Sequence, residues 1–221
     1  MHSSDSLWHE PAEPSIERLA EGVTLLRSFC REEAPTLLKA IDAISEASPF
    51  RQMVVPSGHT MSVAMTNAGD LGWTTDRSGY QYTALDPYTG RLWPPMSETL
   101  FDLAQRAADQ ADFPGFTPNA CLINRYTVGA RLSLHQDKNE EDYSHPIVSV
   151  SLGLPATFLL GKLRRSDTPR RIRIEHGDVL VWGGPARLIY HGIASIAQGS
   201  HPLTGPFRIN LTFRRVATGA L

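Results

Sequence analysis

The segment Phe207–Arg214 constrains the fold most, because its apolar and polar residues alternate without a break. Successive side chains of a β-strand point to opposite faces, so Phe207 and every second residue after it are predicted to face a hydrophobic core. In a β-sandwich or a small barrel, the polar face of such a strand points either to solvent or into an interior ligand cavity. The polar face carries Arg208, Asn210, Thr212 and Arg214.

A shorter segment, Leu122–Tyr126, has the same alternation and places Asn124 and Tyr126 on one face. An amide and a phenol hydroxyl there could line the same cavity, or could be ordinary polar groups of a sheet. Arg208 and Arg214 lie roughly 20 Å apart along an extended strand, at about 3.3 Å per residue. Two guanidinium groups at that spacing cannot grip one carboxylate, but they could hold the opposite ends of a bound diacid.

Two histidines and one aspartate form a candidate metal site: His135 and Asp137 in Leu-His-Gln-Asp, and His191 in Tyr-His-Gly. This ligand set holds catalytic iron(II) on one face and leaves positions open for a co-substrate and oxygen. We expect His135 and Asp137 to share one face of an extended strand. A second His-x-Asp, at His176 and Asp178, is interpreted as a turn before a buried strand. The remaining histidines are treated as non-ligands: His2, His9, His59, His145 and His201.

Several short motifs stand in order along most of the chain. They are Ser48–Met53, Met61–Asn67, Leu71–Thr75, Ala120–Tyr126, Leu134–Lys138, Glu175–Asp178, Val181–Gly184 and Asn210–Arg214. Together they resemble the bacterial type of the AlkB family, which are iron(II)- and 2-oxoglutarate-dependent demethylases of nucleic acids.

The resemblance implies a mostly β fold with flanking helices (α+β), built on a double-stranded β-helix of the jelly-roll type with an N-terminal nucleotide-recognition lid. It assigns His135, Asp137 and His191 as the catalytic iron(II) ligands, with 2-oxoglutarate and oxygen as co-substrates. By the same analogy, Arg208 would grip the far carboxylate of 2-oxoglutarate with help from Tyr126. Three residues would surround the metal-chelating end of 2-oxoglutarate: Asn124, Asn210 and Arg214. The implied reaction oxidises an N-methyl group of a base such as 1-methyladenine or 3-methylcytosine and releases formaldehyde, succinate and carbon dioxide.

Residues 50–95 are rich in aromatic and methionine side chains, and the resemblance places substrate recognition there. A base must leave its stack to reach a buried metal, and a flat aromatic ring is a natural partner for it. The resemblance implies that Trp73 stacks the base against the His135 ring, with Tyr80 and Met61 lining the pocket. Ordinary core packing is the alternative for at least half of this cluster. A methylated adenine or cytosine is positively charged, so stacking on Trp73 would favour damaged over repaired bases.

One position departs from the family, because Asn139 stands where the bacterial type carries Asp near the exocyclic amine of the target base. An asparagine can accept a hydrogen bond but cannot neutralise a positively charged base. The preferred lesion or the efficiency would therefore differ. The acidic residues that follow could supply some of the lost charge or could form an ordinary loop surface. They are Glu140, Glu141 and Asp142.

Six basic residues between positions 162 and 173 predict a basic β-hairpin. The net charge of −2 argues against a protein that binds nucleic acid over its whole surface, so a local basic patch is informative. Arg165 matches a phosphate-contacting position of the family, and a solvated hairpin with no partner is the alternative. The six residues are Lys162, Arg164, Arg165, Arg170, Arg171 and Arg173.

The chain has 221 residues, 41% of them hydrophobic, which suffices for one domain with a sizeable core. We expect a loose N-terminal arm over residues 1–17, one dioxygenase domain over 18–216 and a tail over 217–221. Within the domain, the lid would occupy about residues 50–95 and the iron and 2-oxoglutarate core about 118–216. Two helices are predicted, one near 31–47 and one near 97–111 that is capped by Ser97.

No signal peptide or membrane span is visible in the sequence. The two cysteines, Cys30 and Cys121, are expected to be reduced thiols. We therefore expect a cytoplasmic monomer whose partner is alkylated DNA, single- or double-stranded, with RNA as an alternative.

Two other functions are compatible with parts of the pattern. The first is an oxygenase of the same fold that acts on a protein, a lipid or a free metabolite, which would need neither the Trp73 and Tyr80 lid nor the basic hairpin. The second is a non-catalytic nucleic-acid-binding module. An intact set of metal ligands and arginines argues against that module, because an inactive descendant is free to lose them.

Overall fold

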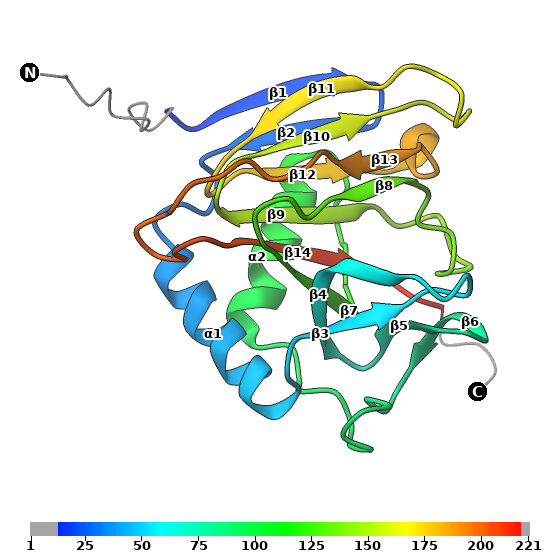
Figure 1. Ribbon diagram of the computed structural model, residues 1–221. Coiled ribbons are helices and arrows are strands. Elements are labelled where there is room, and N and C mark those ends of the chain that lie inside the picture. Colours follow the sequence, from blue (N-terminus) through cyan, green and yellow to red (C-terminus); the bar gives the residue numbers. More distant parts are fainter. Residues whose placement is uncertain (1–12, 218–221) are drawn as a thin grey trace, which may run out of the picture.

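The computed structural model describes residues 13–217 and consists of two antiparallel β-sheets flanked by two α-helices (Figure 1). The larger sheet contains β1 (Ser15–Ala20), β2 (Val23–Arg27), β3 (Arg51–Val54), β4 (Thr60–Gly69), β7 (Ala120–Tyr126), β9 (Ile147–Gly153), β12 (Val179–Trp182) and β14 (Arg208–Arg214). The smaller sheet contains β8 (Leu132–His135), β10 (Ala156–Leu160), β11 (Arg170–Ile174) and β13 (His191–Ile193). A separate hairpin contains β5 (Gly72–Asp76) and β6 (Gly79–Thr83).

The strand order shows that pairing between distant segments builds both sheets. The larger sheet has the order β1-β2-β12-β9-β14-β7-β4-β3, and the smaller has the order β11-β10-β13-β8. The last strand, β14, lies between β9 and β7 near the middle of the larger sheet. The mostly β fold with flanking helices and a double-stranded β-helix core is confirmed.

Both predicted helices are present, as α1 (Ala34–Ala47) and α2 (Glu98–Gln110), and a short 3₁₀ helix spans Gly184–Ala186. The side chain of Ser97 accepts a hydrogen bond from the backbone N–H of Leu100, which satisfies one of the free donors at the start of α2. No helix among residues 13–217 is long and apolar enough to cross a membrane.

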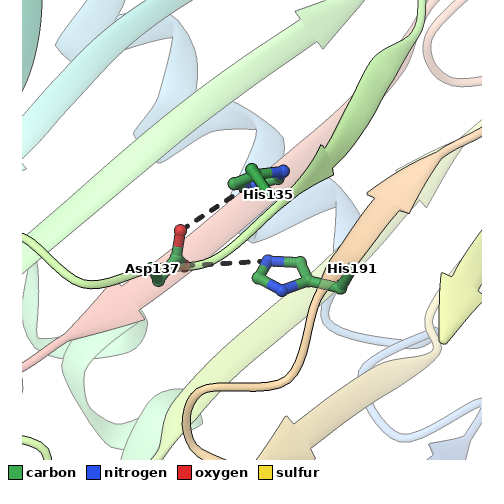
Figure 2. Close-up of side chains that lie close together, drawn as sticks. All are labelled: His135, Asp137 and His191. Atoms are coloured by element: carbon green, nitrogen blue, oxygen red, sulfur yellow. Dashed lines mark ion pairs between the residues drawn. The ribbon is translucent and has the colours of Figure 1, made fainter. Parts of the chain in front are cut away.

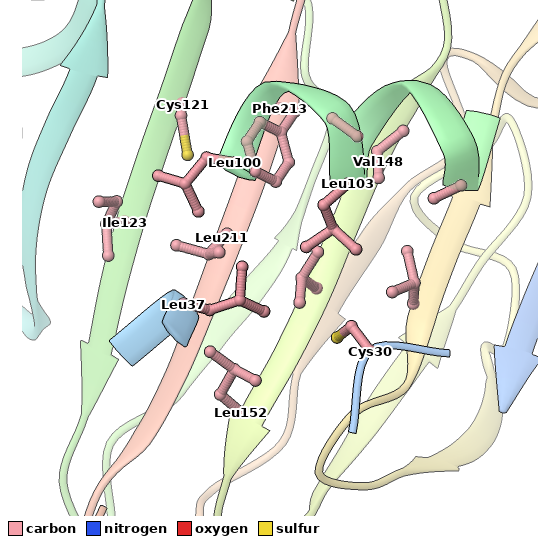
Figure 3. Packing of buried hydrophobic residues seen from close by; sticks show 14 of the residues in the cluster. Cys30, Leu37, Leu100, Leu103, Cys121, Ile123, Val148, Leu152, Leu211 and Phe213 are labelled. Atoms are coloured by element: carbon pink, nitrogen blue, oxygen red, sulfur yellow. The ribbon is translucent and has the colours of Figure 1, made fainter. Parts of the chain in front are cut away.

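The alternation of β14 separates two environments, as its sequence predicts. Ile209, Leu211 and Phe213 pack against α1 and α2 on the outer face of the larger sheet (Figure 3). The four polar side chains of β14 are all buried on the inner face, so the alternative of a solvated face is wrong. Phe207 differs from the expectation, because it precedes β14 and its partly exposed ring lies over the guanidinium of Arg125 instead of in the core.

A second hydrophobic core fills the space between the two sheets. It contains inward-facing residues of the larger sheet, such as Leu122 and Tyr126, and residues of the smaller sheet, such as Phe158 and Leu160. Trp182 is almost fully buried here and its ring lies 5.9 Å from that of Phe158. The polar inner face of β14 is therefore enclosed between two apolar layers.

Two expected boundaries need correction. Ser15–Glu17, which we expected in a loose arm, lie in β1 and pair with Leu25–Arg27. This edge strand is largely exposed, so it has no apolar run that would reveal it. The tail also begins later than expected, because the N–H of Ala217 donates to the carbonyl of Glu140 at 3.1 Å. Residues 1–12 and 218–221 of the expected arm and tail lie outside the described residues.

The larger sheet also extends beyond the expected core of residues 118–216. Four of its eight strands, β1 to β4, come from the N-terminal third of the chain. The stretch expected to be the lid contributes β3 and β4 to this sheet and also contains the hairpin of β5 and β6. Part of the expected lid thus belongs to the larger sheet, whereas the hairpin of β5 and β6 is a sheet of its own, and the boundary of the lid stays a prediction.

His176 and Asp178 form a structural turn before β12. The Nδ1 atom of His176 accepts a hydrogen bond from the N–H of Gly153 at 3.0 Å. The carboxylate of Asp178 accepts from the side chain of Arg27 and from the N–H of Ser28, both at 2.9 Å. Cys30 and Cys121 are buried free thiols.

We predict that Leu211→Ala destabilises the protein by about 2–5 kcal/mol, because the fully buried side chain leaves a cavity between the sheet and the helices. Urea unfolding followed by circular dichroism measures the free energy of unfolding. Leu203→Ala is the matched control, since Leu203 is 48% exposed and its truncation is expected to cost about 0.5 kcal/mol or less. Equal losses in the two variants would contradict the assigned packing.

Candidate metal and co-substrate site

The two histidines of the predicted metal site are brought together by strand pairing in the smaller sheet. His135 ends β8 and His191 begins β13, and the two residues are direct partners across the strand pair. Their ring centroids are 4.4 Å apart. Strand pairing thus brings in the distant third ligand, as the sequence interpretation required.

Asp137 completes the group from the loop that follows β8 (Figure 2). Its Oδ1 atom lies 3.6 Å from Nε2 of His135, and its Oδ2 atom lies 3.9 Å from Nε2 of His191. One ligand atom from each residue lies within 4.8 Å of the others. The expectation that Asp137 continues the strand of His135 is wrong, since β8 ends before it. Over residues 13–217 no other such group of His, Cys, Asp and Glu is found, and His59, His145 and His201 are not part of this one.

Both imidazole rings are oriented by backbone carbonyls. Nδ1 of His135 lies 2.9 Å from the carbonyl oxygen of Ser133, and Nδ1 of His191 lies 3.2 Å from that of Ile189. A carbonyl accepts only, so Nδ1 carries the proton and the lone pair of Nε2 faces the site, as metal binding requires. Burial, with the neighbouring His135, lowers the pKa of His191 to about 3, so this ring is neutral near pH 7.

The carboxylate of Asp137 is held ionised by Arg214. Nε and Nη2 of Arg214 both donate to Oδ2 of Asp137, at 3.0 and 2.7 Å. Burial alone would raise the pKa of Asp137, but Arg214 and the two histidines hold it well below its usual range. The site therefore offers one carboxylate and two imidazoles as ligands, which suits a divalent iron.

Behind this pair lies a buried network that the sequence did not reveal. Glu140 is 1% exposed, and its carboxylate accepts hydrogen bonds from Tyr82 at 2.6 Å and from Arg187 at 3.1 Å. Arg187 also donates to the backbone carbonyls of Asp137 and His145, so it fixes the loop between them. Glu140 is not a surface residue, so the loop-surface alternative for it is wrong. That its charge compensates for Asn139 stays a prediction. A lone arginine before the apolar run Leu188–Tyr190 was the available signal for Arg187.

Arg208 is buried with fewer hydrogen-bond acceptors around it than its N–H groups need. It is 1% exposed, and its Nη2 donates to Oγ of Ser151 at 3.2 Å. Its Nε and Nη1 atoms have no hydrogen-bond partner among the described residues. Burial lowers the pKa of Arg208 to about 10, so the group is still charged at pH 7. A buried guanidinium with two unsatisfied nitrogens is costly unless an anion completes it.

The other residues predicted around 2-oxoglutarate line the same inner face. Strand pairing sets Tyr126 opposite Arg208 and Asn124 opposite Asn210, and the guanidinium of Arg208 lies 5.6 Å from the centre of the Tyr126 ring. Nδ2 of Asn124 donates to Oδ1 of Asn210 at 3.1 Å, while Oδ1 of Asn124 has no partner among the described residues. A cationic group and free polar atoms on one buried face fit a small carboxylic acid.

The aromatic residues predicted to recognise the substrate lie on the hairpin of β5 and β6. The rings of Trp73 and Tyr80 are stacked with centroids 5.8 Å apart and an interplanar angle of 26°. Tyr80 is 50% exposed, while Trp73 and Met61 are partly buried against the core between the sheets. The ring on which Trp73 stacks is thus that of Tyr80, and the predicted stacking of a base between Trp73 and His135 stays a prediction.

The predicted basic hairpin is confirmed, since β10 and β11 pair in register from Ala156 with Ile174 to Leu160 with Arg170. Its six basic residues are all exposed. Arg165 lies in the connection between the strands, and Asn139 is exposed in the loop after the metal ligands. The geometry leaves both side chains accessible to a partner.

The sequence profile of the 2OG-Fe(II) oxygenase superfamily matches residues 22–214. The chain belongs to this superfamily. It is 57% identical over 204 residues to the alpha-ketoglutarate-dependent dioxygenase AlkB of Escherichia coli K12, covering 92% of this chain and 94% of that protein. The AlkB of Salmonella typhimurium is 53% identical over 217 residues, covering 98% of this chain and 97% of that protein. The solved structure of OsALKBH1 has a TM-score of 0.80 at 28% identity and covers 91% of this chain and 100% of that chain.

The resemblance drawn from the motifs is thereby confirmed, and the protein is an AlkB-type dioxygenase that uses iron(II), 2-oxoglutarate and oxygen. The residues of this chain fit both iron(II) and 2-oxoglutarate. The cluster of His135, Asp137 and His191 has the ligand chemistry of iron(II) in oxygenases. The unsatisfied guanidinium of Arg208 matches the need to bind a dicarboxylate.

We predict that His135→Ala lowers the affinity for iron(II) by at least about a hundredfold, because it removes one of three metal ligands. The fold is expected to stay intact, since the side chain of His135 is 36% exposed. Asp137→Ala is expected to lose iron as well and to lower the free energy of unfolding by about 3–5 kcal/mol, because Arg214 is then buried without its carboxylate. Competition with a coloured chelator measures iron affinity, and urea unfolding measures stability.

The matched control is His59→Ala, which removes an exposed histidine outside the cluster and is expected to change neither quantity. An unchanged iron affinity in His135→Ala would contradict the assignment of the metal site.

Proposed function

We propose that this dioxygenase removes N-methyl groups from alkylated bases of DNA, such as 1-methyladenine and 3-methylcytosine, with RNA as a further substrate. This activity is the direct reversal of alkylation damage, a form of DNA repair. The observation that carries the proposal is the stacked pair of Trp73 and Tyr80 on a hairpin that also bonds to the metal site through Tyr82 and Glu140. An exposed aromatic platform next to an iron site suits a flat base that has left its stack.

We assign the far carboxylate of 2-oxoglutarate to Arg208 and Tyr126. A guanidinium presents its donors as a planar fork that matches a carboxylate, and two of the three nitrogens of Arg208 have no partner among the described residues. Asn124 and Asn210 are assigned to the end of 2-oxoglutarate that lies nearer the iron. Asn124 contributes the free Oδ1 atom described above.

The spacing of Arg208 and Arg214 suggested that Arg214 holds one end of a bound diacid. We assign it instead to the metal ligand Asp137. Its donors are engaged by Asp137, and its Nε also lies 3.4 Å from Oε1 of Glu140. It is therefore a positioning residue that keeps Asp137 ionised and fixes its orientation toward the metal, and it contributes positive charge to the end of 2-oxoglutarate near the iron.

When bound, iron(II) and 2-oxoglutarate supply the oxidation: oxygen is divided between succinate and the methyl carbon, and carbon dioxide is lost. The chain holds these groups with His135, Asp137, His191 and Arg208, and its two apolar cores keep water from the enclosed face. Trp73 orients the base so that the methyl group points inward. The hydroxymethyl group formed on nitrogen leaves as formaldehyde, and the neutral base then binds the aromatic platform less tightly.

Asn139 sets this chain's preference among lesions. Asn139 is neutral and Glu140 is tied to Tyr82 and Arg187, so neither residue offers a free carboxylate to a cationic base. We expect cation–π stacking on Trp73 to contribute more of the selectivity here than in a relative with Asp at this position.

The nucleic acid is expected to be held by Arg165 and the other exposed residues of the basic hairpin. A phosphate backbone binds clustered arginines, and a net charge of −2 restricts that attraction to the patch. We propose a monomer that acts in the cytoplasm on single- or double-stranded DNA.

The experiment that tests the function is mass spectrometry of a single-stranded oligonucleotide carrying one 1-methyladenine. The oligonucleotide is incubated with the protein, iron(II), ascorbate and oxygen, with and without 2-oxoglutarate. Loss of one CH₂ is expected only with 2-oxoglutarate. Trp73→Ala is expected to lower the rate about five- to 150-fold, since base stacking is worth about 1–3 kcal/mol.

If the oligonucleotide keeps its methyl group while 2-oxoglutarate is still consumed, demethylation of this lesion is refuted. A protein, a lipid or a free metabolite would then be favoured as substrate. Oligonucleotide binding without any consumption of 2-oxoglutarate would favour the non-catalytic binding module. Asn139→Asp separates a weak lesion preference from a wrong substrate, because it restores the missing carboxylate without altering the metal site.

We predict that Arg208→Ala raises the KM for 2-oxoglutarate about ten- to a hundredfold, since hydrogen bonds to charged groups are worth about 1.5–3 kcal/mol. High 2-oxoglutarate is expected to recover part of the turnover. Succinate formation at varied 2-oxoglutarate measures this. Arg215→Ala is the control, because Arg215 is partly exposed and bonds to the carbonyl of Thr117. A variant that loses only oligonucleotide affinity would refute the assignment.

A further inference from the structure

We propose that Arg125 forms a second anion site, which binds the phosphate group of a nucleotide on the outer face of the larger sheet. Arg125 lies in β7 between Asn124 and Tyr126, and side chains alternate along a strand, so Arg125 points away from the iron and 2-oxoglutarate. It lines a cavity of about 340 Å³ between β3, β4, β7 and the residue that precedes β14. This volume lies within the range of about 300–1,000 Å³ typical of small-ligand pockets.

The guanidinium of Arg125 lies over two phenyl rings. Its central carbon lies 4.4 Å from the centre of the Phe50 ring and 5.2 Å from that of Phe207. Contacts of this kind occupy the flat faces of the group and leave its N–H edges available. Among residues 13–217, no hydrogen bond or ion pair engages those edges.

A comparison with the other arginines that lie over aromatic rings shows that Arg125 is unusual. Arg51, Arg106 and Arg187 each form an ion pair, with Asp86, Glu33 and Glu140 respectively. Only Arg125 and Arg208 combine an aromatic contact with no carboxylate partner among the described residues. Arg208 is the group assigned to the carboxylate of 2-oxoglutarate. Arg125 differs from Arg208 in being partly exposed, so its unpaired N–H groups can be reached by an anion from solvent.

The walls of the cavity favour an anion. None of its eight lining residues is acidic. Gln52 and Thr127 add an exposed amide and an exposed hydroxyl, and Arg51 adds a guanidinium whose charge is offset by Asp86. A phosphate monoester or diester matches the fork of Arg125, and the edges of Phe50 and Phe207 offer apolar contact to an attached sugar or base.

The phosphate can belong to a free nucleotide or to the backbone of a nucleic-acid strand, which share this chemistry. The site does not depend on the iron reaction, because the side chain of Arg125 lies on the other face of β7 from the residues assigned to 2-oxoglutarate. The proposed demethylation and this site can therefore fail separately.

Isothermal titration calorimetry of the full-length protein tests the site. The protein is loaded with iron(II) and saturated with 2-oxoglutarate under nitrogen, so that Arg208 is occupied and no turnover occurs. The probes are inorganic phosphate, adenosine 5′-monophosphate and an unmodified single-stranded 12-mer. We expect the monophosphate or the 12-mer to bind wild-type protein, and Arg125→Gln to weaken that binding at least about tenfold.

Arg106→Gln is the matched control, since it removes an arginine that also lies over a phenyl ring but is already paired with Glu33. It is expected to bind like wild type. Phe207→Leu keeps the charge and removes one ring, so it is expected to weaken binding less than Arg125→Gln does. This second variant, with circular dichroism as a check of folding, keeps the test valid if Arg125→Gln does not fold.

The pattern of binding distinguishes the two sources of phosphate. Binding of the monophosphate that depends on Arg125 supports a free nucleotide. Binding of the 12-mer alone, with the slope of log affinity against log salt reduced by about 1 in Arg125→Gln, supports a strand backbone. The proposal is overturned if no probe binds wild-type protein, or if a folded Arg125→Gln variant binds like wild type. If Arg125→Gln does not fold, it is overturned by a Phe207→Leu variant that binds like wild type.

Discussion

The buried ion pair between Asp137 and Arg214 is the interaction on which the rest of the site depends. A metal-binding carboxylate must be ionised, yet burial disfavours its charge, and Arg214 supplies the opposite charge at 2.7 Å. Breaking such a pair leaves a buried charge uncompensated, so the pair is costly to lose even where its net contribution to stability is small. Because Arg214 ends β14 and Asp137 follows β8, this contact also fixes the two sheets relative to each other at the metal. The same contact thus holds the metal-binding carboxylate and links it to the larger sheet.

The inner face of β14 shows how polar side chains can be buried between two sheets. Asn210 is satisfied by Ser149 and by the carbonyl of Val150, whereas Arg208 keeps two unsatisfied nitrogens. A fold that buries such a deficit is less stable without its ligand, and a ligand that binds only the folded state raises the free energy of unfolding by mass action. If Arg208 holds 2-oxoglutarate as proposed above, binding of this co-substrate also stabilises the sheet.

Local pattern was sufficient to predict some parts of the molecule and insufficient for others. The unbroken alternation of β14 predicted both of its faces, and Ser97 marked the start of α2, because these signals depend on neighbouring residues. Glu140 was misjudged, because its partners Tyr82 and Arg187 are distant in sequence and only the fold brings them together. The strand β1 was missed for a different reason, since an exposed edge strand needs no apolar run. The motifs of the AlkB family indicated the iron ligands more specifically than spacing alone did.

The network around Glu140 also connects the hairpin that carries Trp73 and Tyr80 to the metal ligands. Burial raises the pKa of Tyr82 well above its usual value, so the phenol stays protonated and donates to Glu140. Tyr82 pairs across the hairpin with Trp73, and Tyr80, which stacks on Trp73, is two residues away on the same strand. Glu140 in turn contacts Arg214, which holds Asp137. A chain of buried polar contacts thus runs from the iron ligand to the hairpin that carries the aromatic rings, and each link is shorter than 3.5 Å. The position of these rings relative to the metal ligands is therefore set by the folded core.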